Sequence, residues 1–537
     1  MANTIGTRAS IRSPVPLKIG VLGIAFLFSF PAGYLLWRNF SGDISSLKLL
    51  NKSEVLSPLQ RSLVLSVSVS MTTAMIGMVL AWLTTRCDLP GKRFWKIILP
   101  IPLVFPSFIG AAAFIRTMNP GGFLNGLLNK IGVENVIEIR GFFGAWFVLT
   151  LFCYPYVYLP VAAKLRHLPS SLEETSRVLG YSPRRTFNHV VLPQVAPVLC
   201  AGTLLVFLYT ISDFGAVQLL RYDTLTRSIA TSQLANKSLS LALSLFLLII
   251  AGTIVFTERM VSRSRSSSDQ KSIGPPLEYS LGTWKIPSFI AVSLITLLSL
   301  GAPLFTLSKW ALDGLRRGSG SGQPLTLNGQ QIWESTWNTL SISVIAGIVA
   351  ILAVLPIAIL ISKYKSKAGN LAHSLVVATF AVPGILIALS MRFWSLQSDW
   401  AYNLFNNTKA LLVFSYVVRF GSLAMGVVLL SVMAVPKNLQ DVGQTLGASR
   451  ISRFIRVDLP LMAPGLGAAA GLVILSTMKE LPITLLISPL GFSTLATRMF
   501  SSFEEAFISE AGILAIILVG LSSLLTWFLV IRKADHL

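Results

Sequence analysis

Long apolar runs alternate with short polar segments along almost the whole chain. Each run has the length of about 20 residues that an α-helix needs to cross a bilayer. Backbone amides in lipid must bond within their own segment, and the alternation typical of membrane β-strands is absent, so the runs predict helices. The sequence therefore predicts an all-α polytopic membrane protein. About twelve runs are present, at residues 17–37, 62–85, 96–115, 141–163, 194–220, 238–257, 286–307, 338–362, 371–392, 408–432, 461–488 and 509–531.

One polar segment occurs twice between these runs. Residues 169–193 read PSSLEETSRVLGYSPRRTFNHVVLP, and residues 436–460 read PKNLQDVGQTLGASRISRFIRVDLP. Matching residues lie 267 positions apart, as Gly180 and Gly447 do. Such self-similarity indicates a duplicated architecture. Because the repeated segment is polar, we expect each half of the chain to present it to a partner.

The middle of the chain has the composition of a linker. Residues 261–280, VSRSRSSSDQKSIGPPLEYS, are rich in serine and charged residues and contain Gly-Pro-Pro. We therefore expect two membrane-spanning halves, residues 1–260 and 281–537, with six helices each and a linker on the cytoplasmic side. Pro106 in the third run and Pro383 in the ninth occupy matching places in the two halves.

The charge of the chain reports its topology. It has 44 Lys and Arg against 22 Asp and Glu, a formal net charge of +22, although apolar residues make up 53% of it. More cations fall on the side that would hold the N-terminus and both repeated segments, so the positive-inside rule makes that side cytoplasmic. The cations form no uninterrupted basic patch, and we expect no nucleic acid as a partner. We expect the first apolar run to remain as a helix in the lipid bilayer, not to be cleaved as a signal peptide.

The sequence offers little catalytic or metal-binding chemistry. Its three cysteines and four histidines are scattered and match neither a zinc spacing nor a disulfide framework, so metal ligands are unknown. It contains no G-x-x-x-x-G-K-[ST] motif to cradle ATP phosphates. We expect no cofactor to be bound by this chain and no enzymatic activity of its own.

The first repeated segment predicts two short helices around a glycine turn. Ser170 followed by Glu173 has the spacing of a capping box. Gly180 can take a positive φ and end the first helix. Ser182-Pro183 would start the second helix, with Ser as its N-cap and Pro at its first position. That helix is expected to end at Leu192-Pro193, where the next span begins.

The second copy keeps the same signals. Gly447 matches the glycine turn, Ser449 matches the cap, and Leu459-Pro460 matches the stop. A single copy is also compatible with an amphipathic helix on the membrane surface. Two copies at matched spacing favour a docking role instead.

Both segments resemble the cytoplasmic loop of bacterial ABC-importer permeases. The family pattern has an acidic residue followed by two small ones, then a glycine and a hydrophobic-x-Leu-Pro. The first copy has Glu174-Thr175-Ser176; the second has Asp441-Val442-Gly443, a departure from the ideal Glu-Ala-Ala. In this family the loop is the coupling helix that docks on the ATPase subunit. The resemblance implies that the coupling residues here are Glu174, Gly180, Leu192, Pro193, Asp441, Gly447, Leu459 and Pro460.

The same resemblance implies partners. One fused chain would serve as both membrane halves above two copies of a separate ABC ATPase subunit, which would use the ATP. A periplasmic substrate-binding protein would deliver the substrate at the bacterial inner membrane. Movement of the coupling loops would then rock the halves between outward-facing and inward-facing states.

Two carboxylates inside apolar runs are candidates for a substrate path, because ionisable residues in spans are expensive and default to function. Asp213 and Glu480 lie 267 positions apart, so they occupy equivalent places. Asp213 precedes Phe214-Gly215 and Glu480 precedes Leu481-Pro482, where each helix should break; broken helices are typical of substrate paths. The alternative is that the carboxylates are helix caps near the outer interface, with a snorkelling Lys479 beside Glu480.

Two carboxylates suit a hard cation, which prefers oxygen ligands. Four stretches also resemble those of ferric-iron permeases, which implies iron as the substrate. Thiamine, a phosphonate or an oxyanion such as sulfate or molybdate is the alternative within the ABC class, and a secondary transporter is the alternative outside it. The stretches are CYPYVYLP (153–160), ISDFGAVQLLRYDTLTR (211–227), YVVRFGSLA (416–424) and MKELPITLLISPLGFSTLATR (478–498).

Other polar residues of these stretches have plainer explanations. Tyr154, Tyr156 and Tyr158 could bind iron, but aromatic residues near an interface are more often anchors. Arg419 lies within a span, where we expect it to pair with a carboxylate or a helix C-terminus.

Overall fold

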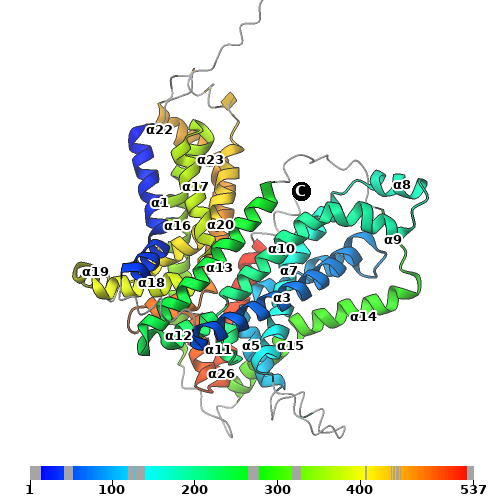
Figure 1. Cartoon of the computed structure of the whole chain (residues 1–537), viewed down its shortest axis with the longest axis horizontal. Helices are drawn as coiled ribbons and strands as arrows, with labels where there is room; N and C mark the ends of the chain where they lie inside the picture. Colours follow the sequence, from blue (N-terminus) through cyan, green and yellow to red (C-terminus); the bar gives the residue numbers. More distant parts are fainter. Residues whose placement is uncertain are drawn as a thin grey trace, which may run out of the picture. The chain divides into compact units, whose positions relative to one another are not determined.

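The computed structural model describes residues 14–41, 52–118, 126, 139–263, 277–316, 328–405, 408–436 and 449–528, with single positions 438, 439, 442, 445 and 447. The regular elements of these residues are helices, and one isolated β-bridge pairs Cys87 with Tyr279 (Figure 1). The expectation of an all-α membrane protein is confirmed.

Among the described residues, ten continuous helical stretches are long and apolar enough to cross a membrane. Three of them contain short π-helical or 3-10 turns that join neighbouring α-helices. The α-helices that make up the ten stretches are α1 (Val15–Ser41), α3 (Ser53–Arg86), α7 (Gly141–Arg166), α9 with α10 (Pro183–Thr186, Leu192–Ser212), α13 (Lys237–Arg263), α14 with α15 (Lys285–Thr296, Ala302–Arg316), α16 (Gly329–Tyr364), α20 (Ala410–Met433), α22 with α23 (Arg450–Arg453, Leu459–Met478) and α26 (Ile508–Thr526).

Two further spans are broken in the middle. The segment Lys92–Val104, which contains α4 (Lys92–Ile98), meets α5 (Ser107–Met118) at an angle of 95°. The segment Lys367–Ala381, which contains α17 (Lys367–Ala378), meets α18 (Gly384–Gln397) at 103°. With each bent pair counted as one span, the described chain has up to twelve, as the sequence predicts.

The breaks fall at the matched prolines. Phe105 before Pro106 has φ −77° and ψ 127°, and Val382 before Pro383 has φ −75° and ψ 113°. A proline ring excludes the α conformation from the residue before it, so the helix ends there and a new one starts beyond. The duplication therefore includes a pair of equivalent bends.

The chain divides into two compact units. One unit comprises Asn39–Trp333 and Leu495–Leu524. Its largest contact joins α3 to α7, and glycine allows the close approach: a Cβ on Gly77 would lie 2.8 Å from Cβ of Val157. On α14–α15, which begin the second half of the sequence, the Thr306 hydroxyl lies 2.7 Å from that of Thr117 on α5. This unit also holds α11 (Gly215–Leu219), α12 (Leu225–Ala235) and α25 (Leu495–Glu504).

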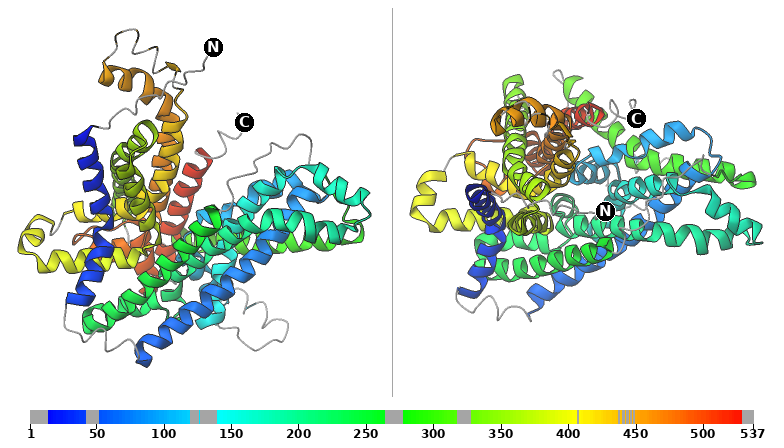
Figure 2. Two further views of the ribbon diagram at one scale, coloured as in Figure 1. Left: turned by 45° about the horizontal axis from the view of Figure 1, so that its top comes forward. Right: turned by 90° about the horizontal axis from the view of Figure 1, so that it is seen from above.

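The other unit comprises Met1–Arg38, Glu334–Thr494 and Leu525–Leu537. Its core joins α1 to α16, α20 and α23, and α1 stands beside these helices in both views of Figure 2. A Cβ on Gly421 would meet the ring of Phe28 at 2.7 Å, so this glycine allows α1 to pack closely on α20. The unit also holds α19 (Asp399–Phe405) and α24 (Pro482–Ile487).

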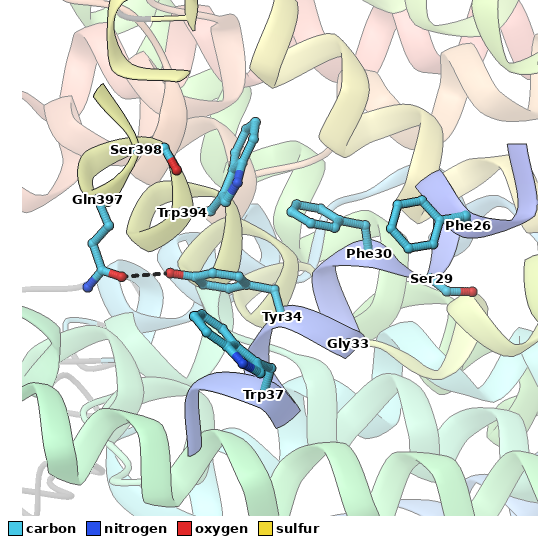
Figure 3. Close-up of a pocket in the computed structure, with 9 residues that line it drawn as sticks. All are labelled: Phe26, Ser29, Phe30, Gly33, Tyr34, Trp37, Trp394, Gln397 and Ser398. Carbon is cyan, nitrogen blue, oxygen red and sulfur yellow. Dashed lines mark hydrogen bonds between the residues drawn. The ribbon is translucent and has the colours of Figure 1, made fainter. Parts of the chain in front are cut away.

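A groove of about 580 Å³ runs along α1 in this second unit (Figure 3). The Phe30 ring packs edge-on against Trp394 with centroids 5.3 Å apart, and the Tyr34 hydroxyl donates to Oε1 of Gln397 at 3.0 Å. The lining is mainly aromatic, with Gln397 and two serines as its other polar side chains. Its residues are Phe26, Ser29, Phe30, Gly33, Tyr34, Trp37, Trp394, Gln397 and Ser398.

The compact units do not coincide with the two halves of the sequence: they differ in the first span of each half and in Leu495–Leu524, which belongs to the unit with Asn39–Trp333. The first span of the first half, α1, packs with the body of the second half. The span that opens the second half, α14–α15, packs with the body of the first. Of the expected linker 261–280, residues 264–276 lie outside the described residues.

Candidate functional site

The first repeated loop forms the predicted helix–glycine–helix. Helix α8 (Ser170–Val178) ends at Gly180, whose φ is +84°. The amide of Tyr181 donates to the carbonyl of Ser176 at 3.1 Å, the bond that closes a left-handed C-terminal turn. Ser182 then caps α9, since its Oγ accepts from the amide of Arg185 at 3.4 Å. Figure 1 places α8 and α9 at one end of α3 and α7.

Two details of the sequence prediction are wrong in this loop. The capping box is absent: α8 has Pro169 as its N-cap with no side-chain cap bond, because Glu173 turns inward to a buried cation. The helix also does not stop at Leu192-Pro193. It passes through a π-helical turn at Phe187–Val191 into α10, and this wider turn precedes the proline, whose missing amide would break a regular helix.

The second loop repeats the geometry where it is described. Gly447 has φ +75°, and Oγ of Ser449 accepts from the amide of Ser452 at 3.2 Å. A π-helical turn at Phe454–Asp458 again leads into the next span, so the predicted stop at Leu459-Pro460 is wrong for the same reason. Asp441 lies outside the described residues.

Each loop exposes an apolar surface. Glu174 is exposed on α8, and Val178 and Leu179 are 86% and 71% exposed. In the second loop, Val442 is 52% and Ile451 is 73% exposed. Exposed apolar side chains gathered beside polar ones are typical of interaction sites. The described residues of this chain leave these surfaces open to a partner.

The opposite face of α8 is held by a buried ion pair. Nη1 of Arg86, the last residue of α3, lies 3.1 Å from Oε1 of Glu173, and both side chains are fully buried. Nη2 of Arg86 donates to the carbonyl of Leu168 at 3.1 Å, and the Tyr279 hydroxyl donates to Oε2 of Glu173. Losing only one partner of such a pair is strongly destabilising, because it leaves a buried charge uncompensated.

The second loop is held by a different carboxylate. Nζ of Lys363, near the end of α16, lies 2.5 Å from Oδ2 of Asp458 in the π-helical turn. Lys363 matches Arg86 at the same offset, 277, that relates Pro383 to Pro106. The carboxylates do not match: Gln440 stands at the position of Glu173, and Val191 at the position of Asp458. Equivalent cations therefore hold the two loops at different points.

The two carboxylates of the candidate substrate path lie at equivalent breaks. Asp213 follows α10; its Oδ2 accepts from Oγ of Ser107 at 2.5 Å and its Oδ1 from the amide of Ala216 at 3.0 Å. Ser107 is the first residue of α5, and Ala216 lies in the first turn of α11. The N-termini of two short helices therefore stabilise the carboxylate.

Glu480 has the same arrangement in the other unit. Its Oε1 accepts from the amide of Ile483 in α24 at 3.4 Å, and a Cβ on Gly384, the first residue of α18, would lie 2.6 Å from this atom. Each carboxylate therefore lies next to two helix ends. One is the C-terminus of a long helix, α10 or α23, and the other is the N-terminus of the second arm of a bent span, α5 or α18. Both carboxylates accept from the amides of short helices, as a capping residue does, while a position near the outer interface and a role in a substrate path stay predictions. Lys479 lies at the C-terminus of α23.

Two of the three tyrosines of the fourth span are buried, so the interpretation as interface anchors is wrong for these two. Tyr154 is fully buried and donates to the carbonyl of Leu99 at 2.8 Å. Tyr158 is 2% exposed and its hydroxyl lies 3.3 Å from that of Thr84. The ring of Tyr156 packs on Tyr209, with centroids 5.5 Å apart. These side chains tie α7 to its neighbours.

Arg419 caps a helix C-terminus, as the sequence predicts. Its Nη1 donates to the carbonyls of Phe380 and Val382, at the end of the first arm of the broken span. Within the described ranges, no three His, Cys, Asp or Glu side chains gather as they would around a metal ion.

Sequence reasoning missed Arg86, Lys363 and Tyr279, and it gave Glu173 a capping role in place of an ion pair. Arg86, Glu173 and Tyr279 come from three distant segments, so their contact has no local signal. One signal was available for the cations: Arg86 and Lys363 are basic residues at the same offset as the matched prolines.

Duplicated halves, bent spans and two exposed loops define a multi-pass permease. Its sequence matches the family described as binding-protein-dependent transport system inner membrane components, over residues 67–262 and 354–533. These segments cover more than half of the chain, which belongs to this family. It is accordingly a multi-pass inner-membrane permease, a transport subunit of an ABC importer.

Individual relatives extend the similarity. The Fe(3+)-transport system permease protein FbpB 2 of Haemophilus influenzae is 28% identical over 96% of this chain and 97% of its own length. The ferric transport system permease protein FbpB of Actinobacillus pleuropneumoniae is 25% identical over 79% of this chain and 63% of its own length. A probable sulfate transport system permease protein cysT of Marchantia polymorpha is 24% identical over 43% of this chain and 82% of its own length.

Proposed function

We propose that this permease moves ferric iron, delivered by a periplasmic binding protein, into the cytoplasm. The observation that carries the proposal is the similarity to the Haemophilus iron permease, which runs through almost the full length of both chains. The sulfate relative matches less than half of this chain. A full-length match includes both bent spans and both loops, whereas a partial match need not.

We propose further that the two exposed loops dock on two copies of an ATPase subunit. The apolar surface around Val178 and Leu179, with Glu174 beside it, suits a groove on a partner. The buried pair of Arg86 and Glu173 supports the role, since a lever must be fixed at its inner face to transmit motion. ATP would then be used by the partner subunits and no cofactor by this chain.

Asp213 and Glu480 are our candidates for lining the path. Supporting this, each lies at the junction of two broken helices, and the arrangement occurs once in each half. Carboxylate oxygens suit a hard cation better than an anion. Opening of the breaks during alternating access would expose both carboxylates to the substrate.

Sulfate transport is the second candidate, supported by the cysT similarity. An anion path would use helix N-termini and cations. At both junctions, however, a carboxylate of the protein already accepts hydrogen bonds from the helix N-termini. Because these amides already donate to carboxylates of the protein, the junctions favour iron over an anion such as sulfate.

Reconstitution tests both parts of the proposal. The chain is purified with the ATPase subunit and binding protein from its gene neighbourhood and placed in vesicles with ATP enclosed. We expect co-purification of the ATPase and ATP-dependent uptake of radioactive ferric iron but not of sulfate. Uptake of sulfate alone would overturn the iron assignment, and uptake indifferent to ATP would overturn coupling.

A further inference from the structure

The chain that enters the second half of the sequence is fastened to the end of α3. We call residues 277–285 the strap. The amide of Tyr279 donates to the carbonyl of Arg86 at 2.7 Å, and the amide of Asp88 donates to the carbonyl of Tyr279 at 3.2 Å. These two bonds form the isolated β-bridge with Cys87. A strand-like pairing in an otherwise helical unit fixes the strap in register.

Side chains fasten the strap on both sides of the bridge. Oδ1 of Asp88 accepts from the amide of Leu281 at 2.8 Å, and its Oδ2 lies 3.2 Å from Nζ of Lys285. Nζ of Lys92 lies 2.7 Å from Oε1 of Glu278. Each of these pairs is partly exposed and stabilises only weakly by itself. Together with the bridge they hold Tyr279 in one place.

Tyr279 connects the strap to α8. Its hydroxyl donates to Oε2 of Glu173, the buried carboxylate that also pairs with Arg86. The guanidinium of Arg177, on the same short helix, lies 5.3 Å from the centre of its ring, and the ring of Trp82 on α3 lies 5.3 Å away on centroids. Burial and the carboxylate of Glu173 raise the pKa of Tyr279, so the hydroxyl remains a donor at neutral pH.

We propose that the strap is part of the coupling device, with Tyr279 as a positioning residue that holds α8 against α3. The inference rests on the proposed docking of α8 on an ATPase subunit. Displacement of α8 is passed through Glu173 to Arg86 on α3. Through Tyr279 it also reaches Lys285 at the start of α14, the first span of the second half. One ATPase contact thereby drives two spans.

The two possible roles of the strap, adding stability and transmitting motion, lead to different effects when it is disrupted. Loss of stability lowers the amount of folded complex, so ATP hydrolysis and uptake fall together. Loss of transmission leaves hydrolysis in place while uptake falls. The number of ATP molecules hydrolysed per substrate ion transported separates the two.

The test compares Tyr279→Phe and Tyr279→Ala with the wild type in vesicles containing the ATPase subunits and binding protein. Uptake is measured with radioactive ferric iron, or with sulfate if that is what wild-type vesicles take up. We expect the ATP hydrolysed per ion to rise at least about five-fold in Tyr279→Ala. We expect a smaller rise in Tyr279→Phe, which keeps the ring contacts. An unchanged ratio in Tyr279→Phe and in any Tyr279→Ala complex that folds overturns the inference.

A matched control is Tyr222→Phe. The Tyr222 hydroxyl donates to the carbonyl of Arg61 at 3.4 Å, near the other end of α3, so the variant removes one hydroxyl from the same unit. We expect its ratio to equal that of the wild type; an equal rise there contradicts a specific role for Tyr279. Co-purification of ATPase with the wild type is scored separately. Its failure removes the proposed docking, whereas retained co-purification with an unchanged ratio removes only the strap.

Discussion

The two loops have the same shape and different attachments. Both have a glycine with positive φ, a serine cap and a π-helical turn that leads into a span. The first is held through Glu173 in its first helix, and the second through Asp458 at the entrance to the span. Duplicated copies have kept the backbone geometry and the cation while the carboxylate has changed position. The outer shape of such a loop is therefore more constrained than its inner attachment.

The largest expected effect removes what the loops share. Gly180→Pro or Gly447→Pro would require φ near −65° where the backbone has +84° or +75°. The two short helices could not keep their relative direction, and we expect ATP-dependent uptake to be lost while the spans still insert. Uptake in vesicles and protease accessibility of the loops measure the two effects. Normal uptake in both variants contradicts the coupling role.

A smaller effect should distinguish the attachments. Arg86→Met leaves the fully buried Glu173 without its ion partner, which should destabilise the protein by about 3–5 kcal/mol. Thermal unfolding of the detergent-solubilised protein measures the loss. The double variant Arg86→Met with Glu173→Met is the control, since removing both charges should recover much of the stability. No recovery would mean that packing, not charge, dominates the site.

The equivalent change in the second loop should be milder. The Lys363 side chain is 22% exposed, so water can reach the site when Lys363→Met removes the cation. We expect a loss of about 1–3 kcal/mol, the range for leaving a buried acceptor unsatisfied. The same unfolding measurement compares it directly with Arg86→Met. Equal losses would show that burial does not set the difference between the loops.

The smallest expected effect concerns the strap, which contacts the first loop through Tyr279. The amide of Leu281 and the ammonium of Lys285 hold the pKa of Asp88 below its usual range. A depressed carboxyl pKa stabilises the fold above the usual value and loses that contribution as pH falls through the folded value. Unfolding differences between wild type and Asp88→Asn should therefore be constant from about pH 5 to 8 and shrink below about pH 4. A difference that varies between pH 5 and 8 contradicts this assignment.

The elements set by local chemistry could be predicted from the sequence. Apolar length predicts the spans and Gly180 predicts the turn, because each depends on neighbours in the chain. Pro106 and Pro383 are matched in the sequence, and the structure shows that each marks a bend. That the helices continue through Pro193 and Pro460 could not be predicted. A π-helical turn precedes each proline, and the helix runs on into the next span. The duplication showed that Asp213 and Glu480 are equivalent, and the structure identified the groups that donate hydrogen bonds to them.

The attachments of the loops could not be predicted for another reason. Glu173 and Glu174 are adjacent and identical in type, yet one is fully buried and the other exposed. Which of them faces inward depends on where Arg86 and Tyr279 lie, and these come from distant parts of the sequence. A pattern along one helix can identify a polar face but cannot show which distant charge lies beneath it.

The π-helical turns before the two spans also fix a rotation. The amide of Leu192 bonds to the carbonyl of Phe187 and that of Leu459 to Phe454, so each turn contains one residue more than an α-helical turn. One residue corresponds to about 100° around a helix axis. The extra residue therefore sets the azimuth of the loop surface relative to the side chains that the span presents in the membrane. Shortening either turn by one residue would turn that surface away by more than a quarter of a circle without altering any residue on it.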